Sequence, residues 1–112
     1  MTDENKAKNL AGKVLDLNEL AGYGEGSVVS RTVVDKKIGT VTLFAFDAGE
    51  GLSEHTAPYD ALVYVFDGTA EITISGAPFR VSAGRMIIMP ANEPHELRAV
   101  EKFKMMLVMI RA

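Results

Sequence analysis

The chain contains no cysteine and no tryptophan, and its 112 residues include only two histidines and four prolines. Because cysteine is absent, the protein has no disulfide framework, no thiol nucleophile and no thiolate ligand for zinc. Its 12 basic residues are scattered along the chain and are outnumbered by 15 acidic ones, so the formal net charge is −3. Nothing in this charge pattern indicates a nucleic-acid partner.

Long apolar runs are also missing, and none is long enough to cross a bilayer. The polar N-terminus lacks the apolar stretch of a secretory signal, so we expect a cytoplasmic protein with no membrane partner. Hydrophobic residues make up 47% of the chain, enough for one domain of this length to bury a core. We expect residues 1–12 to form a flexible polar leader and residues 13–112 to form the single domain.

Short runs rich in β-branched residues recur every 8 to 12 residues or so, separated by turn residues, and this spacing predicts an all-β fold. The expected strands are 27–34, 39–46, 61–66, 70–75, 78–81, 86–89, 96–100 and 103–110. A single helix is expected around residues 15–21. Repeated short strands indicate a sandwich or a closed barrel, and closure removes the exposed sheet edges.

The dipeptides Asp67-Gly68 and Ser75-Gly76 are typical of tight turns. Asp-Gly supplies the positive φ of a two-residue hairpin loop, so we expect 61–66 and 70–75 to form a β-hairpin. Side chains on a strand alternate between its faces. If Ala61, Val63 and Val65 point into the core, the intervening residues from Asp60 onwards point outwards.

The two histidines, His55 and His95, each lie beside an apolar strand-forming run, where a side chain can reach the mouth of a barrel. A neutral imidazole both donates and accepts hydrogen bonds and can act as a general acid or base. A single histidine is often structural, but two at such equivalent places indicate a pocket.

The residues around these histidines resemble the two motifs of the cupins, and the chain resembles a small single-domain, RmlC-like cupin. The resemblance implies a double-stranded β-helix, or jelly-roll barrel, here with a short N-terminal extension. Three residues match the first motif, Gly49, His55 and Gly68, and three match the second, Gly84, Pro90 and His95. Asn92 replaces the middle glycine of the second motif. Ala57 and Ala61 stand where the first motif has a second histidine and a glutamate.

The resemblance implies a site at His55 and His95, and two kinds of occupant remain open. One is a divalent metal (iron, manganese, nickel or zinc), which normally needs three or four ligands. Asp60 is the candidate third ligand if a bulge after Pro58 turns it inwards, although it can equally cap the local turn. The other is a small apolar ligand, with the pocket lined also by Val63, Val65, Met89 and Phe103.

Three functions follow from this interpretation. The first is a small-molecule-binding cupin of unassigned activity, with no certain cofactor. The second is a metal-dependent oxygenase, isomerase or lyase that uses His55, His95 and Asp60. The third is a stand-alone ligand-sensing module. Segment 13–34 adds apolar residues beyond the motifs, and with the resemblance it predicts a homodimer.

Overall fold

The computed structural model describes residues 10–111, a short helix followed by eight β-strands. The elements are α2 (Leu17–Leu20), β1 (Val28–Lys36), β2 (Gly39–Phe46), β3 (Gly51–His55), β4 (Ala61–Ile74), β5 (Ala77–Ser82), β6 (Met86–Met89), β7 (His95–Arg98) and β8 (Phe103–Ile110). The predicted all-β class is confirmed, and the strands expected at 39–46, 86–89 and 103–110 have the predicted bounds. The predicted leader lies mostly outside the described residues.

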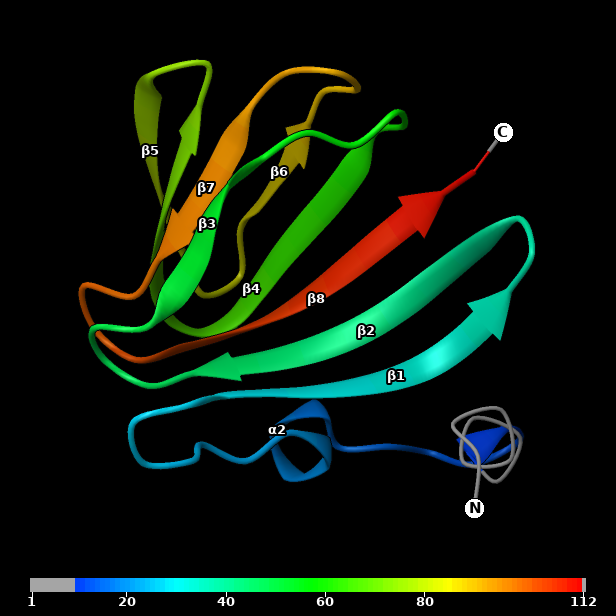
Figure 1. Cartoon of the computed structure of the whole chain (residues 1–112). Helices are drawn as coiled ribbons and strands as arrows, with labels where there is room; N and C mark the ends of the chain where they lie inside the picture. The colour runs from blue at the N-terminus through cyan, green and yellow to red at the C-terminus, as the bar shows by residue number, and fades with distance from the viewer. Residues whose placement is uncertain (1–9, 112) are drawn as a thin grey trace.

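All strand pairs are antiparallel, and the long strand β4 belongs to both halves of a curled sheet (Figure 1). Its first half pairs with β6 and β8, and β8 continues through β2 to β1. Its second half pairs with β5 and β7, and β7 continues to β3. The two halves face one another across the core, which is the double-layered arrangement of a jelly roll.

The hairpin expected at Asp67-Gly68 is wrong, because β4 runs through both residues without turning back. Pairing between β4 and β8 shifts between Val65 and Asp67, which is where the strand passes from one half of the sheet to the other. Gly68 has φ +70, and a Cβ there would lie 2.1 Å from the carbonyl oxygen of Lys102. The positive φ of Asp-Gly is therefore used for a β-bulge instead of a turn.

The turn expected at Ser75-Gly76 is confirmed, since both residues have positive φ, of 48° and 82°, and join β4 to β5. Strand β3 was not predicted. Its sequence, Gly-Leu-Ser-Glu-His, is polar and its side chains are mostly exposed, so it has no apolar alternation to reveal it. It forms the outer edge of its half of the sheet, where a polar strand is well tolerated.

The core lies between the two halves, and the expected alternation along β4 is confirmed. Ala61, Val63 and Val65 are buried and belong to the main hydrophobic cluster. The rings of Phe46 and Phe103 stack at the base of this cluster, with centroids 4.5 Å apart. Full burial of each such side chain contributes about 1.5–3 kcal/mol, so the inward faces of β2, β4 and β8 supply most of the driving force for folding.

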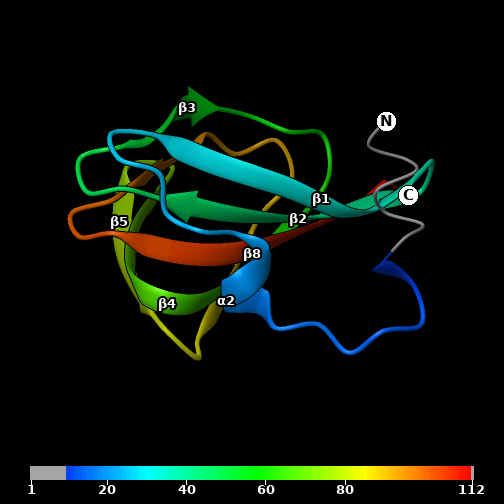
Figure 2. The same cartoon turned by 90° about the horizontal axis from the view of Figure 1, so that it is seen from below.

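The segment before β1 covers part of the outer surface of the sheet, where α2 lies against β2, β4 and β8 (Figure 2). Helix α2 begins after Asp16, whose side chain accepts a hydrogen bond from the backbone N–H of Asn18 (2.9 Å). Beneath α2 the outward residues of the strands form a second apolar cluster with the segment; its members include Leu17, Leu20, Ala21, Leu43, Ala45, Phe66 and Met106. No helix within residues 10–111 is long and apolar enough to span a membrane.

Candidate functional site

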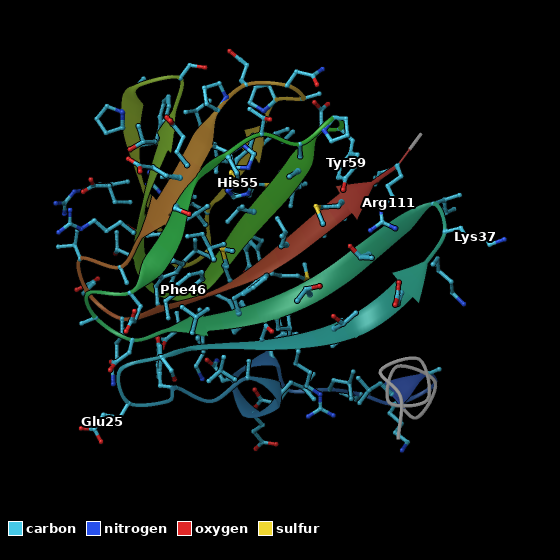
Figure 3. The ribbon with its side chains drawn as sticks, viewed as in Figure 1. Glu25, Lys37, Phe46, His55, Tyr59 and Arg111 are labelled. Carbon is cyan, nitrogen blue, oxygen red and sulfur yellow. The ribbon has the colours of Figure 1, made fainter. Side chains whose placement is uncertain are left out.

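The two histidines lie opposite one another on neighbouring strands, although 40 residues separate them in the chain. His55 ends β3 and His95 begins β7, and the two residues are paired in the register of these strands. Their Nε2 atoms are 3.2 Å apart, and the rings meet edge to face with centroids 4.4 Å apart. Figure 3 shows His55 directed towards the space between β3 and β4. The predicted pairing of the histidines is therefore present in the structure.

Each imidazole is held through its other nitrogen by a backbone carbonyl two residues earlier. Nδ1 of His55 is 2.7 Å from the carbonyl oxygen of Ser53, and Nδ1 of His95 is 3.1 Å from that of Glu93. A carbonyl oxygen only accepts, so each Nδ1 carries the hydrogen and donates it. These contacts set both tautomers and leave the two Nε2 atoms facing one another.

The two rings differ in their contact with solvent. His95 is only 3% exposed, whereas His55 is an exposed residue at the end of an edge strand. Burial lowers the pKa of His95 below its usual 6.5; the neighbouring His55 acts in the same direction, and the Glu93 carbonyl partly opposes them. His95 is therefore uncharged at neutral pH.

Hydrogen bonds connect the loop that follows His55 to the loop that precedes His95. The backbone N–H of Asn92 donates to the carbonyl of Ala57 (2.7 Å), and that of Ala91 donates to Oδ1 of Asp60 (2.9 Å). Asn92 has φ +64, which agrees with its place at a glycine position of the motif. The two loops are therefore joined to each other on the side of the barrel that carries both histidines.

The β4–β5 turn holds the end of the second loop. The backbone N–H of Ser75 donates to the carbonyl of Pro94 (2.8 Å), and the Ser75 hydroxyl donates to Oε1 of Glu93 (3.2 Å). Glu93 is the residue whose carbonyl anchors His95. Sequence reasoning missed Ser53, Ser75 and Glu93, because backbone carbonyls and turn contacts leave no signal in residue type.

The structure does not bring Asp60 to the histidine pair as a third ligand. Strand β4 starts its inward alternation at Ala61, no bulge turns Asp60 inwards, and the exposed carboxylate is engaged by Ala91. Among residues 10–111, no group of three or more histidine, cysteine, aspartate or glutamate side chains is placed to hold a metal ion. The hydrogen bond of Asp60 reaches a loop 31 residues away in the chain, so it is not the cap of the local turn that the sequence also suggested.

The apolar residues expected to line the pocket belong to the packed core. Val63, Val65 and Phe103 are completely buried and Met89 is 3% exposed, so none of them presents an open surface. The apolar residues nearest to the pair in the strand register are Ile74, which is opposite His95, and Leu52 of β3. Both are partly buried against the core and are better placed to meet a bound molecule.

Glycines at two further motif positions lie in the turns that precede β3 and β6. Gly49 has φ +87, and its N–H donates to the carbonyl of Ala99 (2.7 Å), beside β3 and β7. Gly84 has φ +89, and its N–H donates to the carbonyl of Val65 (2.8 Å), at the turn before β6. The glycine positions of the motifs are thus sites of left-handed backbone, which glycine adopts without strain.

A separate groove of about 490 Å³ lies on the outer face of the sheet and does not include either histidine. It is lined by Pro58, Tyr59, Asp60, Leu62, Ile88, Ala91, Val108 and Ile110. At its rim the Arg111 guanidinium lies 5.9 Å from the centre of the Tyr59 ring (Figure 3). This groove is backed by the outward residues of β4, β6 and β8, opposite to the face that the core occupies.

Residues 42–111 match the family model described as a cupin domain. A conserved protein of unknown function from Streptococcus pyogenes superposes with a TM-score of 0.86 and 40% identity, over 90% of this chain and 89% of its own. A cupin 2 conserved barrel domain protein from Leptotrichia buccalis is 42% identical with a TM-score of 0.80, over 82% of this chain and 45% of its own.

A curated relative, the polyketide synthase CurC of Streptomyces cyaneus, is 26% identical over 99 residues. The match covers 88% of this chain but only 64% of that relative. The family match, the jelly-roll topology and the paired histidines at the motif positions agree with one another. The chain therefore belongs to the cupin family, as a small RmlC-like cupin.

Proposed function

We propose that this cupin binds a small organic molecule at the mouth of the barrel, with His55 and His95 at the centre of the site. The observation that carries the proposal is the approach of the two Nε2 atoms to 3.2 Å, with both tautomers set by backbone carbonyls. Ile74 and Leu52 give the surroundings an apolar character. Ligand sites in proteins commonly combine apolar walls with a few polar groups that orient the ligand.

A purely structural role explains this arrangement poorly. Buried polar atoms in folded proteins are normally satisfied by a complementary partner. With both Nδ1 atoms donating to carbonyls, the contact between the Nε2 atoms is a hydrogen bond only when one of the rings carries a second proton. A bound group beside the two Nε2 atoms can contact both rings at once.

A divalent metal is the second candidate for that group, and the Nε2 separation favours it. Two metal–nitrogen bonds of about 2.0–2.1 Å whose nitrogens are 3.2 Å apart enclose an angle of about 100°, between the octahedral and tetrahedral values. Donation from Nδ1–H to a carbonyl is also the usual support of a metal-binding histidine.

The number of ligands does not fit a resident metal. The described residues supply two imidazoles, whereas metal sites in proteins usually have three or four ligands, and Asp60 is engaged elsewhere. The histidines alone therefore do not complete a metal centre. The oxygenase, isomerase and lyase activities that the family resemblance suggested depend on such a centre. A ligand-sensing module would use the same two histidines as a protein that only binds the ligand.

The name of one curated relative supports an organic ligand. Among those described above, CurC has a functional name, polyketide synthase, and this chain spans 64% of its length. A name of this kind agrees with a small carbon compound as the occupant of the barrel.

The test is the retention of a ligand by gently purified protein, measured by native mass spectrometry and elemental analysis. We expect an organic adduct, without stoichiometric metal, on the wild type and on a Glu54→Ala control, in which an exposed neighbour on the same strand is changed. The adduct should be absent from the His55→Ala/His95→Ala double variant. Stoichiometric metal that the double variant loses would favour the second candidate. An empty wild type that binds no compound of a fragment library would overturn the proposal.

We also propose that a second copy of the chain covers the outer face of β4, β6 and β8. Met86, Ile88 and Ile110 are 53%, 51% and 63% exposed there, and the outward residues that lie among them, Leu62, Tyr64 and Val108, are uncharged as well. In a two-fold dimer each residue near the axis faces its own copy, so an uncharged face meets itself without repulsion. Exposed apolar surface of this kind commonly marks an interface.

A further inference from the structure

The segment that precedes α2 carries apolar side chains that its own barrel leaves uncovered. Every side chain from Ala11 to Asp16 is exposed, whereas α2 itself packs into the second apolar cluster. Val14 is fully exposed and its neighbour Leu15 is 36% exposed. In Figure 2 this segment leaves α2 and runs outside the sheet. Residues 10–16, which we call the arm, therefore present two adjacent apolar side chains to a neighbouring molecule.

The groove of about 490 Å³ on the outer face of the sheet is a surface that such side chains fit. Most of its lining is apolar, from Pro58, Leu62, Ile88, Val108 and Ile110. A pocket of a few hundred Å³ accepts a drug-sized molecule, so this groove has room for two aliphatic side chains. Its lining includes no residue of the arm, so among the described residues the arm does not fill the groove of its own chain.

The charges beside these two apolar surfaces are complementary. The groove has a carboxylate, Asp60, in its lining and a guanidinium at its rim, where Arg111 lies 5.9 Å from the centre of the Tyr59 ring. On the arm, Lys13 precedes the apolar pair and Asp16 follows it. With the pair in the groove, Lys13 can face Asp60 while Asp16 faces Arg111. Complementary charges of this kind fix the orientation of a contact and disfavour other partners.

The arm and the groove belong to the same face of the sheet. Helix α2 lies against β2, β4 and β8, and the groove is backed by β4, β6 and β8. A second copy on this face can bring its arm to the groove of the first, and two-fold symmetry makes the contact reciprocal. The seven residues of the arm span up to about 23–25 Å when extended, as far as the 23 Å shortest dimension of the molecule. The arm is therefore long enough to cross an interface between two copies.

We propose that the arm of one copy places Val14 and Leu15 in the outer groove of a second copy, and that the second copy does the same in return. This inference rests on the proposed dimer and names the contact that holds it together. The groove includes Asp60 and Ala91, whose hydrogen bond joins the two loops beside the histidines. Each arm thus also stabilises the loops that position the histidine pair of the other copy.

The natural absence of cysteine allows a direct test, because an introduced pair of cysteines can react only with each other. Val14→Cys and Ile110→Cys are combined in one protein, which is oxidised gently and separated on a non-reducing gel. A disulfide forms only where the two Cα atoms come within about 7 Å. We expect a covalent dimer from the double variant and none from either single variant. Val100→Cys/Ile110→Cys is the matched control, with an exposed position outside the arm, and should not form a crosslink.

A second experiment measures the strength of the contact by sedimentation equilibrium. In Val14→Ser/Leu15→Ser the two apolar side chains are lost, so the dimer should dissociate at least about tenfold more readily. Both residues are exposed within one copy, so the variant is expected to fold. Val100→Ser, at an exposed valine outside the arm, should leave the dissociation constant unchanged. Amide exchange at Ala91 and Asn92 should be faster in the arm variant than in the control.

The possible outcomes separate this inference from the proposed dimer and from ligand binding. A disulfide within one chain would mean that the arm covers its own groove, and the exchange between copies would be wrong. An arm variant that dimerises as strongly as the wild type, or a Val100 control that crosslinks equally well, would overturn the inference and leave the dimer in place. Unchanged amide exchange in a weakened dimer would refute the effect on the histidine loops. A monomeric wild type would overturn the dimer and the inference together, whereas the retained adduct tests ligand binding independently.

Discussion

The carboxylate of Asp60 accepts a hydrogen bond from the backbone N–H of Ala91 over 2.9 Å. This contact joins the segment between β3 and β4 to the loop that leads into β7, and each of these two strands carries one histidine of the pair. Asp60 thus acts on the site through the backbone, at the position where the sequence suggested a metal ligand. Its role is to hold two loops together.

Replacing Asp60 by alanine should therefore loosen the site without removing any group that contacts the ligand. We expect a loss of about 1 kcal/mol in the free energy of unfolding, the usual net value of one hydrogen bond. The Nε2 resonances of both histidines should broaden in NMR spectra. Asp60→Asn keeps an acceptor oxygen and should restore most of the wild-type behaviour. If Asp60→Ala and Asp60→Asn lower the stability and broaden the resonances equally, this role of Asp60 is contradicted.

The left-handed backbone of Gly68 gives a prediction about stability. A Cβ at Gly68 would meet the Lys102 carbonyl at 2.1 Å, so Gly68→Ala should cost more than about 2 kcal/mol through both strain and overlap. The matched control is Gly76→Ala, where φ is +82 but no atom lies within 4 Å. This control should cost only about 1–2 kcal/mol. Urea unfolding measures both, and equal losses would mean that the bulge at Gly68 is not tightly packed.

Tyr23 joins the N-terminal segment to the barrel, since its hydroxyl donates to Oδ2 of Asp67 over 2.6 Å. Burial raises the pKa of Tyr23, and the hydrogen bond to Asp67 acts in the same direction, so the hydroxyl remains a donor throughout the neutral range. Tyr23→Phe should lower the free energy of unfolding by about 1–2 kcal/mol. It should also speed amide exchange in α2. The control, Tyr59→Phe, keeps the ring that faces Arg111 and should change stability little.

The lowered pKa of His95 predicts how stability depends on pH. Between the folded-state pKa and 6.5, the unfolded chain binds more protons at this residue than the folded protein does. The stabilisation from a neutral His95 is thus complete above about pH 6.5 and is lost as the pH falls through the folded-state value. The unfolding free energy should fall from pH 7.5 to 5.5, and His95→Gln should show a smaller decrease. An equal decrease in both proteins would assign the effect to other groups.

The proposed dimer is tested by changing the charge of the outer apolar face. We expect the wild type to have the mass of two chains in light scattering coupled to gel filtration. Ile88→Lys would place like charges against one another across a two-fold axis and should give a monomer. Val100→Lys, at an exposed apolar residue between β7 and β8, is the control and should leave the mass unchanged. A monomeric wild type would rule out the interface.

Several features of the molecule were determined by local sequence. The bounds of β2, β6 and β8 follow from runs of β-branched and apolar residues between turn residues. The inward alternation from Ala61 follows from the two-residue period of a strand, and both histidines stand at the ends of strands, as their motif positions indicated. These features depend on neighbours in the chain, so periodicity and turn preference suffice to predict them.

Other features were decided only by the tertiary structure. Asp67-Gly68 has the composition of a turn, but the approach of the Lys102 backbone makes it a bulge within β4. Val63 and Phe103 were expected to line the pocket, and the packing of the two halves of the sheet makes them fully buried members of the core. The 3.2 Å approach of the Nε2 atoms joins residues 40 positions apart. It depends on strand register and on carbonyls that any residue type can supply, so no local pattern encodes it.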